Sequence, residues 1–171
     1  NSRPVKKGFL SGLLSGNQGI DLDLGCLYEL KNGEKGAVQA LGNAFGTLNR
    51  APYIMLDGDD RTGAAAAGEN LRINGDKLCE FKRILVYTFI YEGVANWQQA
   101  DAIVTIKYPG AEDIIVKMDS YNSSNIMCGL ALFENQKDQT FSVEKIVQFY
   151  QGHQALDQAF NWGMRWKAGR K

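Results

Sequence analysis

Carboxylate side chains are concentrated in two short stretches of this 171-residue chain. Residues 57 to 68 read DGDDRTGAAAAG, which places three aspartates within four positions and then four alanines between glycines. Residues 21 to 24 read DLDL, so Asp21 and Asp23 lie two positions apart. If this stretch is a strand, both side chains point to the same face, about 6 to 7 Å apart by the strand rise. Charges this close repel one another unless a positive group lies among them.

Coordination of a hard cation is the chemistry that suits these side chains. Ca²⁺ takes about six to eight oxygen ligands and Mg²⁺ about six in a tighter geometry. Arg61 can neutralise only part of the acidic charge. The candidate ligands are Asp21, Asp23, Asp57, Asp59, Asp60, Glu69 and Asn70. An acidic turn that faces water is the alternative, because DGDD is also an ordinary turn composition. The segment is not an EF-hand, since Thr62 and Gly68 stand where that loop needs Gly and Glu.

Other kinds of reactive site lack their usual sequence signals. The one histidine, His153, has no cysteine or carboxylate beside it at zinc-ligand spacing, and the chain contains neither CxxC nor HxxxH. No GxSxG motif supplies a nucleophile, and no glycine-rich loop connects a strand to a helix in the way that phosphate binding requires. We therefore expect no catalytic residues, and we expect His153 to be a surface or capping residue at the start of a helix.

Composition and charge describe a globular protein. Hydrophobic residues make up 44% of the chain, and 19 basic side chains balance 19 acidic ones, so no excess charge favours nucleic acid. The cysteines Cys26, Cys79 and Cys128 lie far apart in apolar stretches, and an odd number is not typical of a disulfide framework. We predict three buried, reduced thiols and a cytoplasmic location. Residues 1–7 are interpreted as a linker end or a cloning remnant, and residues 8–171 as a single domain.

Alternation of apolar and polar residues predicts an all-β fold. In residues 19 to 31, GIDLDLGCLYELK, apolar residues occupy every second position and mostly polar residues lie between them, which indicates a half-buried strand. Further strands are predicted at 52–57, 82–93, 102–110, 113–119, 126–135 and 140–150. Short strands at this spacing favour an antiparallel β-sandwich of two sheets. Residues 153–166 space apolar side chains at helical intervals and predict a short C-terminal helix packed against a sheet edge or end. The three tryptophans are expected to serve in packing rather than as a sugar-binding or membrane-facing platform.

Several motifs together resemble the TerD domain family of tellurium-resistance and general-stress proteins, and most closely its TerA branch. They are GIDLDLGCLYEL, GDDRTG, GENLRIN, FKRILVYTFIYEG and YQGHQALDQAFNWG, in the family's order. The resemblance implies a β-sandwich that binds calcium without catalysis. It also implies a role in bacterial resistance to tellurite and other stresses, with other tellurium-resistance or stress proteins as partners, including a membrane-associated complex. The implied ligands are Asp21, Asp23, Asp59, Asp60, Glu69 and Asn70.

One segment departs from the family pattern. Residues 64–67 are alanines where relatives carry carboxylates, so this segment offers a cation only main-chain oxygens. Because ligand charge tunes calcium affinity, a weaker site is expected, or one occupied by Mg²⁺ or water. Two other functions stay open: a calcium-assisted carbohydrate-binding sandwich that uses Trp97 or a nearby aromatic residue, and a metal-dependent phosphoesterase acting through Asp59 or Asp60.

Overall fold

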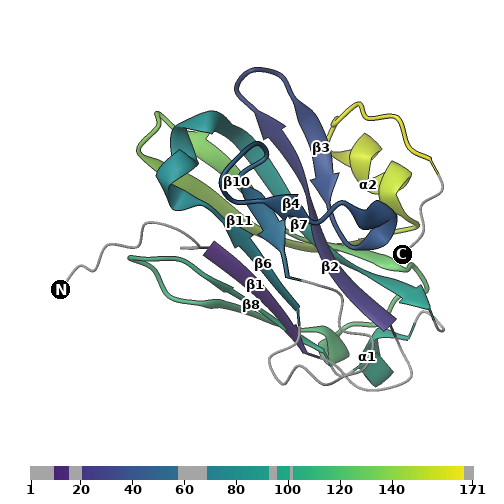
Figure 1. The fold of residues 1–171 in the computed structure, drawn as a ribbon. Helices are drawn as coiled ribbons and strands as arrows, with labels where there is room; N and C mark the ends of the chain where they lie inside the picture. The colour runs from purple at the N-terminus through teal and green to yellow at the C-terminus, as the bar shows by residue number, and fades with distance from the viewer. Residues whose placement is uncertain (1–9, 16–20, 58–68, 93–95, 101, 168–171) are drawn as a thin grey trace.

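Two antiparallel sheets pack face to face in the computed structural model, which describes residues 10–15, 21–57, 69–92, 96–100 and 102–167 (Figure 1). The six-stranded sheet has the order β4-β5-β6-β1-β8-β9, and the five-stranded sheet has the order β11-β10-β7-β2-β3. The predicted all-β sandwich with a short C-terminal helix is therefore confirmed.

The strands follow the chain in the order of their numbers. They are β1 (Leu10–Ser15), β2 (Asp21–Leu30), β3 (Lys35–Val38), β4 (Gly46–Thr47), β5 (Ile54–Leu56), β6 (Glu69–Ile73), β7 (Phe81–Glu92), β8 (Ile103–Lys107), β9 (Ile114–Lys117), β10 (Met127–Gln136) and β11 (Thr140–Tyr150). The helices are α1 (Trp97–Ala100) and α2 (His153–Ala159), and the 3-10 turns are η1 (Leu41–Asn43), η2 (Gly75–Glu80) and η3 (Met118–Ser120). All seven predicted strands are present. The strands β1, β3, β4 and β6 had not been predicted.

A core of apolar side chains fills the space between the sheets. Leu24 and Ile84 from the five-stranded sheet meet Ile54, Leu71 and Val104 from the six-stranded sheet. Each of these strands directs alternate residues inward, as the period of two requires. The part of the inter-sheet core that comes from the predicted strands therefore follows from the sequence pattern, whereas Leu71 comes from β6, which was not predicted.

A second core lies on the outer face of the five-stranded sheet. It joins Leu27, Leu85 and Tyr87 to Leu156 of α2 and to Trp162, all of them buried. The prediction that β2 is half-buried is consequently wrong, because α2 and the segment that follows it cover the face opposite the inter-sheet core. Both faces of β2 are shielded from water.

The C-terminal helix is shorter than predicted. It ends at Ala159 rather than continuing to residue 166, and the chain then turns through Asn161 (φ 55°) and Gly163 (φ 77°). Residues 160–167, called the C-terminal segment below, run back along the outer face in irregular conformation. Phe160 and Met164 therefore lie outside the helix, although their spacing in the sequence fits a helix.

Two of the three cysteines are buried as predicted, and the prediction for Cys79 is wrong. Cys26 and Cys128 are inside the inter-sheet core, where burial raises the pKa of each thiol to about 12. Cys79 is exposed because it lies in η2 at the surface. Trp97 and Trp162 are buried, which confirms packing as their role and rules out Trp97 as a sugar-binding surface. Within the part of the chain that the structure describes, no helix has the length and apolar character needed to cross a bilayer.

Candidate metal centre

In the first half of β2, a main-chain N–H group on the side toward β3 is hydrogen-bonded to a carboxylate instead of to a strand. Pairing between β2 and β3 begins only at Cys26, so the strand before that residue has no β3 neighbour. There the main-chain N–H of Leu24 donates to Oε1 of Glu69 at 2.7 Å. Glu69 is the first residue of β6 and is only 7% exposed. This hydrogen bond places the third predicted motif directly beside the first.

Asp23 is fully buried next to that hydrogen bond. It lies opposite Phe89 of β7, and its main-chain oxygen accepts from the hydroxyl of Thr88 at 2.7 Å. Strand alternation puts its side chain on the same face as Leu27, toward the outer core. Burial, with a smaller effect from the charge of Asp23, raises the pKa of Tyr87 well above its usual range. Two buried carboxylates, Asp23 and Glu69, therefore belong to adjoining positions at one end of the sandwich.

Asp57 and Asn70 come to the same end but face another way. The main-chain N–H of Asp57 donates to the carbonyl of Asn70 at 2.9 Å, so the two residues lie opposite each other. The Asp57 carboxylate pairs with Arg72 at 3.3 Å in a partly exposed position. Since side chains alternate along β6, Asn70 and Arg72 point away from the face that carries Glu69. Asp57 thus has a positive partner of its own.

The remaining predicted ligands lie outside what the structure describes. Asp59 and Asp60 fall in residues 58–68, together with Arg61 and the alanines 64–67, and of Asp21 only the main chain, paired with Glu92, is described. Among the described residues, no three His, Cys, Asp or Glu side chains gather as metal ligands would. The seven-residue set therefore stays a prediction. The two buried carboxylates fit it in chemistry, because both supply the hard oxygen donors that Ca²⁺ prefers.

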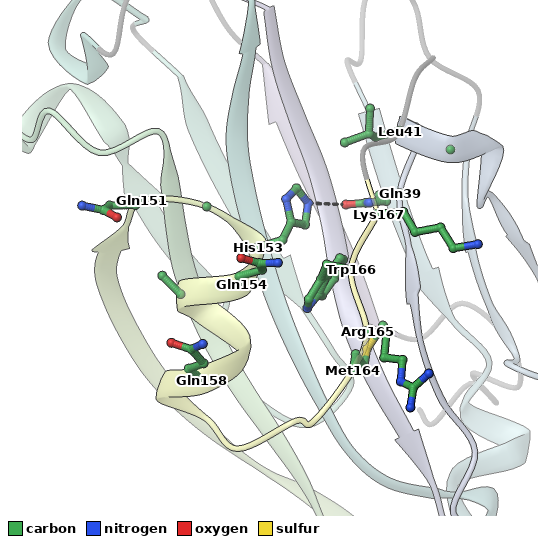
Figure 2. Close-up of a pocket in the computed structure, with 13 residues that line it drawn as sticks. Gln39, Leu41, Gln151, His153, Gln154, Gln158, Met164, Arg165, Trp166 and Lys167 are labelled. Atoms are coloured by element: carbon green, nitrogen blue, oxygen red, sulfur yellow. Dashed lines mark hydrogen bonds between the residues drawn. The ribbon is translucent and has the colours of Figure 1, made fainter.

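His153 is not the surface residue that the sequence suggests. It begins α2 as predicted, but its ring packs edge-on against Tyr87 and Phe89 at centroid distances of 5.6 and 4.9 Å. Its Nε2 lies 2.7 Å from Oε1 of Gln39 (Figure 2). Burial lowers the pKa of this histidine to about 4. Nothing in the sequence around Gln39 signals this contact, because the two residues are 114 positions apart.

The chain resembles proteins of one group in both sequence and structure. It is 42% identical over 164 residues, 96% of its length, to the tellurium resistance protein TerA of an Alcaligenes species. The match covers 48% of that relative, so the chain spans about half the length of the curated relative. No protein-family model matches it.

Two solved structures share the fold at low sequence identity. A homologue of telluride resistance protein (TerD) from Streptomyces coelicolor A3(2) superposes with a TM-score of 0.66 at 16% identity, over 90% of this chain and 95% of that one. A protein of unknown function superposes with a TM-score of 0.63 at 14% identity, over 88% of this chain and 95% of the other.

Proposed function

This chain belongs to the TerD family of tellurium-resistance proteins, and from that premise we propose that it is a non-catalytic calcium-binding module serving tellurite resistance and the general stress response. One observation carries the calcium part of the proposal. Glu69, buried at the start of β6, hydrogen-bonds to the main chain of β2 beside the buried Asp23. Two motifs that are separated by 45 residues in sequence thereby share one end of the sandwich.

The electrostatics of this end favour a bound cation. Removing a carboxylate from water costs free energy, and a second carboxylate nearby adds to that cost. A divalent ion bound at this end of the sandwich would offset part of that cost, because it supplies positive charge at short range. The hydrogen bond from the main-chain N–H of Asp57 to the carbonyl of Asn70 sets the residues that flank positions 58–68 next to each other, and Asp59 and Asp60 follow Asp57 by two and three positions along the chain. The proposed ligands are the carboxylates of Asp21, Asp23, Asp59, Asp60 and Glu69.

The affinity should be lower than that of a cytosolic calcium buffer. Residues 64–67 are alanines and contribute no charge, and calcium affinity falls with each missing carboxylate. We propose a dissociation constant between about 10⁻⁶ and 10⁻³ M. The module would act in the cytoplasm with other tellurium-resistance or stress proteins, including those of a membrane-associated complex. The relative that the chain matches is named a tellurium resistance protein, and that name supports the resistance role.

A calcium titration followed by NMR and by thermal unfolding tests the site. If calcium binds the folded chain only, the free energy of unfolding should rise by about 2.7 kcal/mol when free calcium is 100 times the dissociation constant. The largest amide shifts should fall on Asp23, Leu24 and Glu69. Asp59→Asn should remove most of this gain and leave the calcium-free stability nearly unchanged, because it removes one repelling charge.

The matched control is Asp119→Asn, which replaces an exposed aspartate in η3 and should keep the full calcium response.

A separate assay tests the non-catalytic role: wild-type protein should give no turnover of p-nitrophenyl phosphate with calcium or magnesium. Unmoved amide signals and an unmoved melting temperature at 10 mM calcium would refute the calcium site. Phosphatase turnover abolished by Asp59→Asn would refute the non-catalytic role.

A further inference from the structure

A pocket of about 790 Å³ opens on the outer side of the five-stranded sheet. One wall comes from the chain after β3, with Gln39 and Leu41, and the other from α2 together with Met164 to Lys167 of the C-terminal segment (Figure 2). A pocket of this volume falls in the range that small-molecule sites occupy. None of the described candidate metal ligands Asp23, Asp57 and Glu69 lines it.

A fixed hydrogen-bond network forms the floor of the pocket. The hydroxyl of Tyr87 donates to Oε1 of Gln39 at 2.6 Å, and Nε2 of His153 lies 2.7 Å from the same oxygen. An amide oxygen only accepts, so Nε2 of His153 carries the proton and Nδ1 is an acceptor. With Oε1 engaged by two donors, the amide group of Gln39 is held in one orientation and its NH₂ group is a positioned donor.

Trp166 forms an equally fixed side wall. Its Nε1 donates to Oδ2 of Asp157 at 3.0 Å, and its ring lies 5.0 Å from that of His153. The carboxylate of Asp157 also accepts from the main-chain N–H groups of Gly163 and Met164, at 2.8 and 2.9 Å. Its charge is thus directed into the C-terminal segment rather than into the pocket. Because these hydrogen bonds already hold the Trp166 side chain in place, little conformational entropy is lost when a ligand binds against it.

The chemistry of the rim is cationic and rich in amides. Arg165 and Lys167 are exposed at the mouth, Gln154 and Gln158 project from α2, and none of the described residues that line the pocket is acidic. Burial keeps His153 neutral at pH 7, since its pKa is about 4. The oxygen of an amide group accepts from a hydroxyl group and its NH₂ donates to one, and guanidinium pairs with carboxylate or phosphate in a bidentate manner.

We propose that this pocket binds an acidic sugar, meaning a pyranose that carries a carboxylate or a phosphate group. The sugar ring lies along the indole of Trp166, its hydroxyl groups exchange hydrogen bonds with Gln39, Gln154 and Gln158, and its acidic group pairs with Arg165 and Lys167. An aromatic face beside polar side chains suits a ring that has both C–H and O–H groups. Arg165 and Lys167 favour a sugar that carries a negative charge over a neutral one.

Titration of the calcium-free protein with four probes tests the proposal and keeps it distinct from the calcium site. D-glucuronate and glucose 6-phosphate should cause saturable NMR shifts at the Trp166 indole and the Gln39 side-chain amide, with a dissociation constant below about 5 mM. D-glucose should bind about tenfold more weakly, because it lacks the charge. Inorganic phosphate should not saturate the same signals in that range.

Arg165→Gln should weaken glucuronate binding about tenfold and leave glucose binding unchanged. Arg50→Gln, an exposed arginine on another part of the molecule, is the matched control and should bind as wild type does. Both substitutions are at the surface, so folding is expected to be intact. Equal binding of phosphate and glucuronate would overturn the sugar in favour of a simple anion site. Unmoved Trp166 and Gln39 signals at 20 mM glucuronate, or full binding by Arg165→Gln, would overturn the proposal as a whole.

Discussion

The two cores of the molecule are built by different means. The inter-sheet core consists of apolar side chains from regular strands, as in the packing of Phe133 against Phe141. The outer core rests on polar anchors, because the C-terminal segment has no regular secondary structure and needs side-chain partners for its main-chain groups. Asp157 supplies one anchor by accepting from Gly163, Met164 and Trp166.

Arg83 supplies a second anchor on the same face. Its guanidinium donates to Oε1 of Glu29 at 2.6 Å and to the main-chain carbonyls of Phe160 and Asn161, and its Cζ lies over the ring of Trp162, 3.7 Å from the centroid. A planar, multidentate cation suits this site better than an ammonium group would. Charged side chains thus hold an irregular segment in place, although it lacks the alternation of apolar residues that holds the strands.

The largest effect is expected from truncation inside the inter-sheet core. Phe133→Ala removes a buried ring that two strands enclose, and should lower the free energy of unfolding by about 3 to 5 kcal/mol, measured by urea denaturation. Ile115→Ala is the control, because this side chain is 51% exposed and should cost less than about 1 kcal/mol. Similar losses for the two variants would contradict the assignment of Phe133 to the core.

A smaller and more local effect is expected from the polar anchor of the outer core. Asp157→Asn preserves size but removes the charge and part of the acceptor capacity, so it should cost about 2 kcal/mol. Hydrogen exchange should speed up at the main-chain amides of Gly163 and Met164 and at the indole N–H of Trp166, while β7 and β10 stay protected. Asp119→Asn serves as the exposed control. Loss of protection throughout both sheets would show instead that the two cores unfold as one.

The alternation of residues was enough to predict most strands of the inter-sheet core, although not β3 or β6, and it could not predict the outer core. β2 was expected to face water on one side, because Asp21, Asp23 and Glu29 interrupt its apolar residues. The strand is nevertheless buried on both faces, since Glu29 pairs with Arg83 and Leu27 packs under Trp162. Such pairings join residues far apart in sequence, and periodicity carries no information about them.

For the candidate metal centre, too, the sequence indicated the residues but not how they are arranged. Sequence reasoning selected Asp23 and Glu69, and the structure brings both to one end of the sandwich through the hydrogen bond to Leu24. The predicted set did not separate them from Asp57, whose ion pair with Arg72 depends on pairing between β5 and β6. β6 had not been predicted, so the face on which each residue lies could not be derived.

The pH dependence of stability should reveal the burial of His153 in the outer core. Its folded pKa of about 4 lies below an unfolded value near 6.5, so the unfolded chain binds more protons between these limits. The contribution of neutral His153 to the free energy of unfolding is therefore fully present above about pH 6.5 and is lost as the pH drops toward 4. Because solvent still reaches part of the ring, we expect a total loss of about 1 to 2 kcal/mol between pH 7 and pH 5.

His153 is the only histidine in the chain, which makes the test specific. Urea denaturation at pH 7, 6 and 5 should show the decline in wild-type protein and a flat profile in His153→Gln. This variant loses ring contacts with Tyr87 and Phe89 and should be less stable at every pH. An equal slope in both proteins would mean that carboxylates, rather than His153, control stability in this range.

The smallest effect concerns the thiols, which report on the inter-sheet core without perturbing it. Cys26 and Cys128 are buried there and burial raises the pKa of each to about 12, so they stay protonated and shielded, whereas Cys79 is exposed in η2. A thiolate is the reactive form, so a disulfide reagent should label one thiol per native chain and all three after unfolding. Labelling Cys79, or adding a reductant, should change the melting temperature by less than about 1 °C, because no buried contact is lost. Rapid labelling of two or more thiols in the native protein would show that the inter-sheet core opens far more readily than its packing predicts.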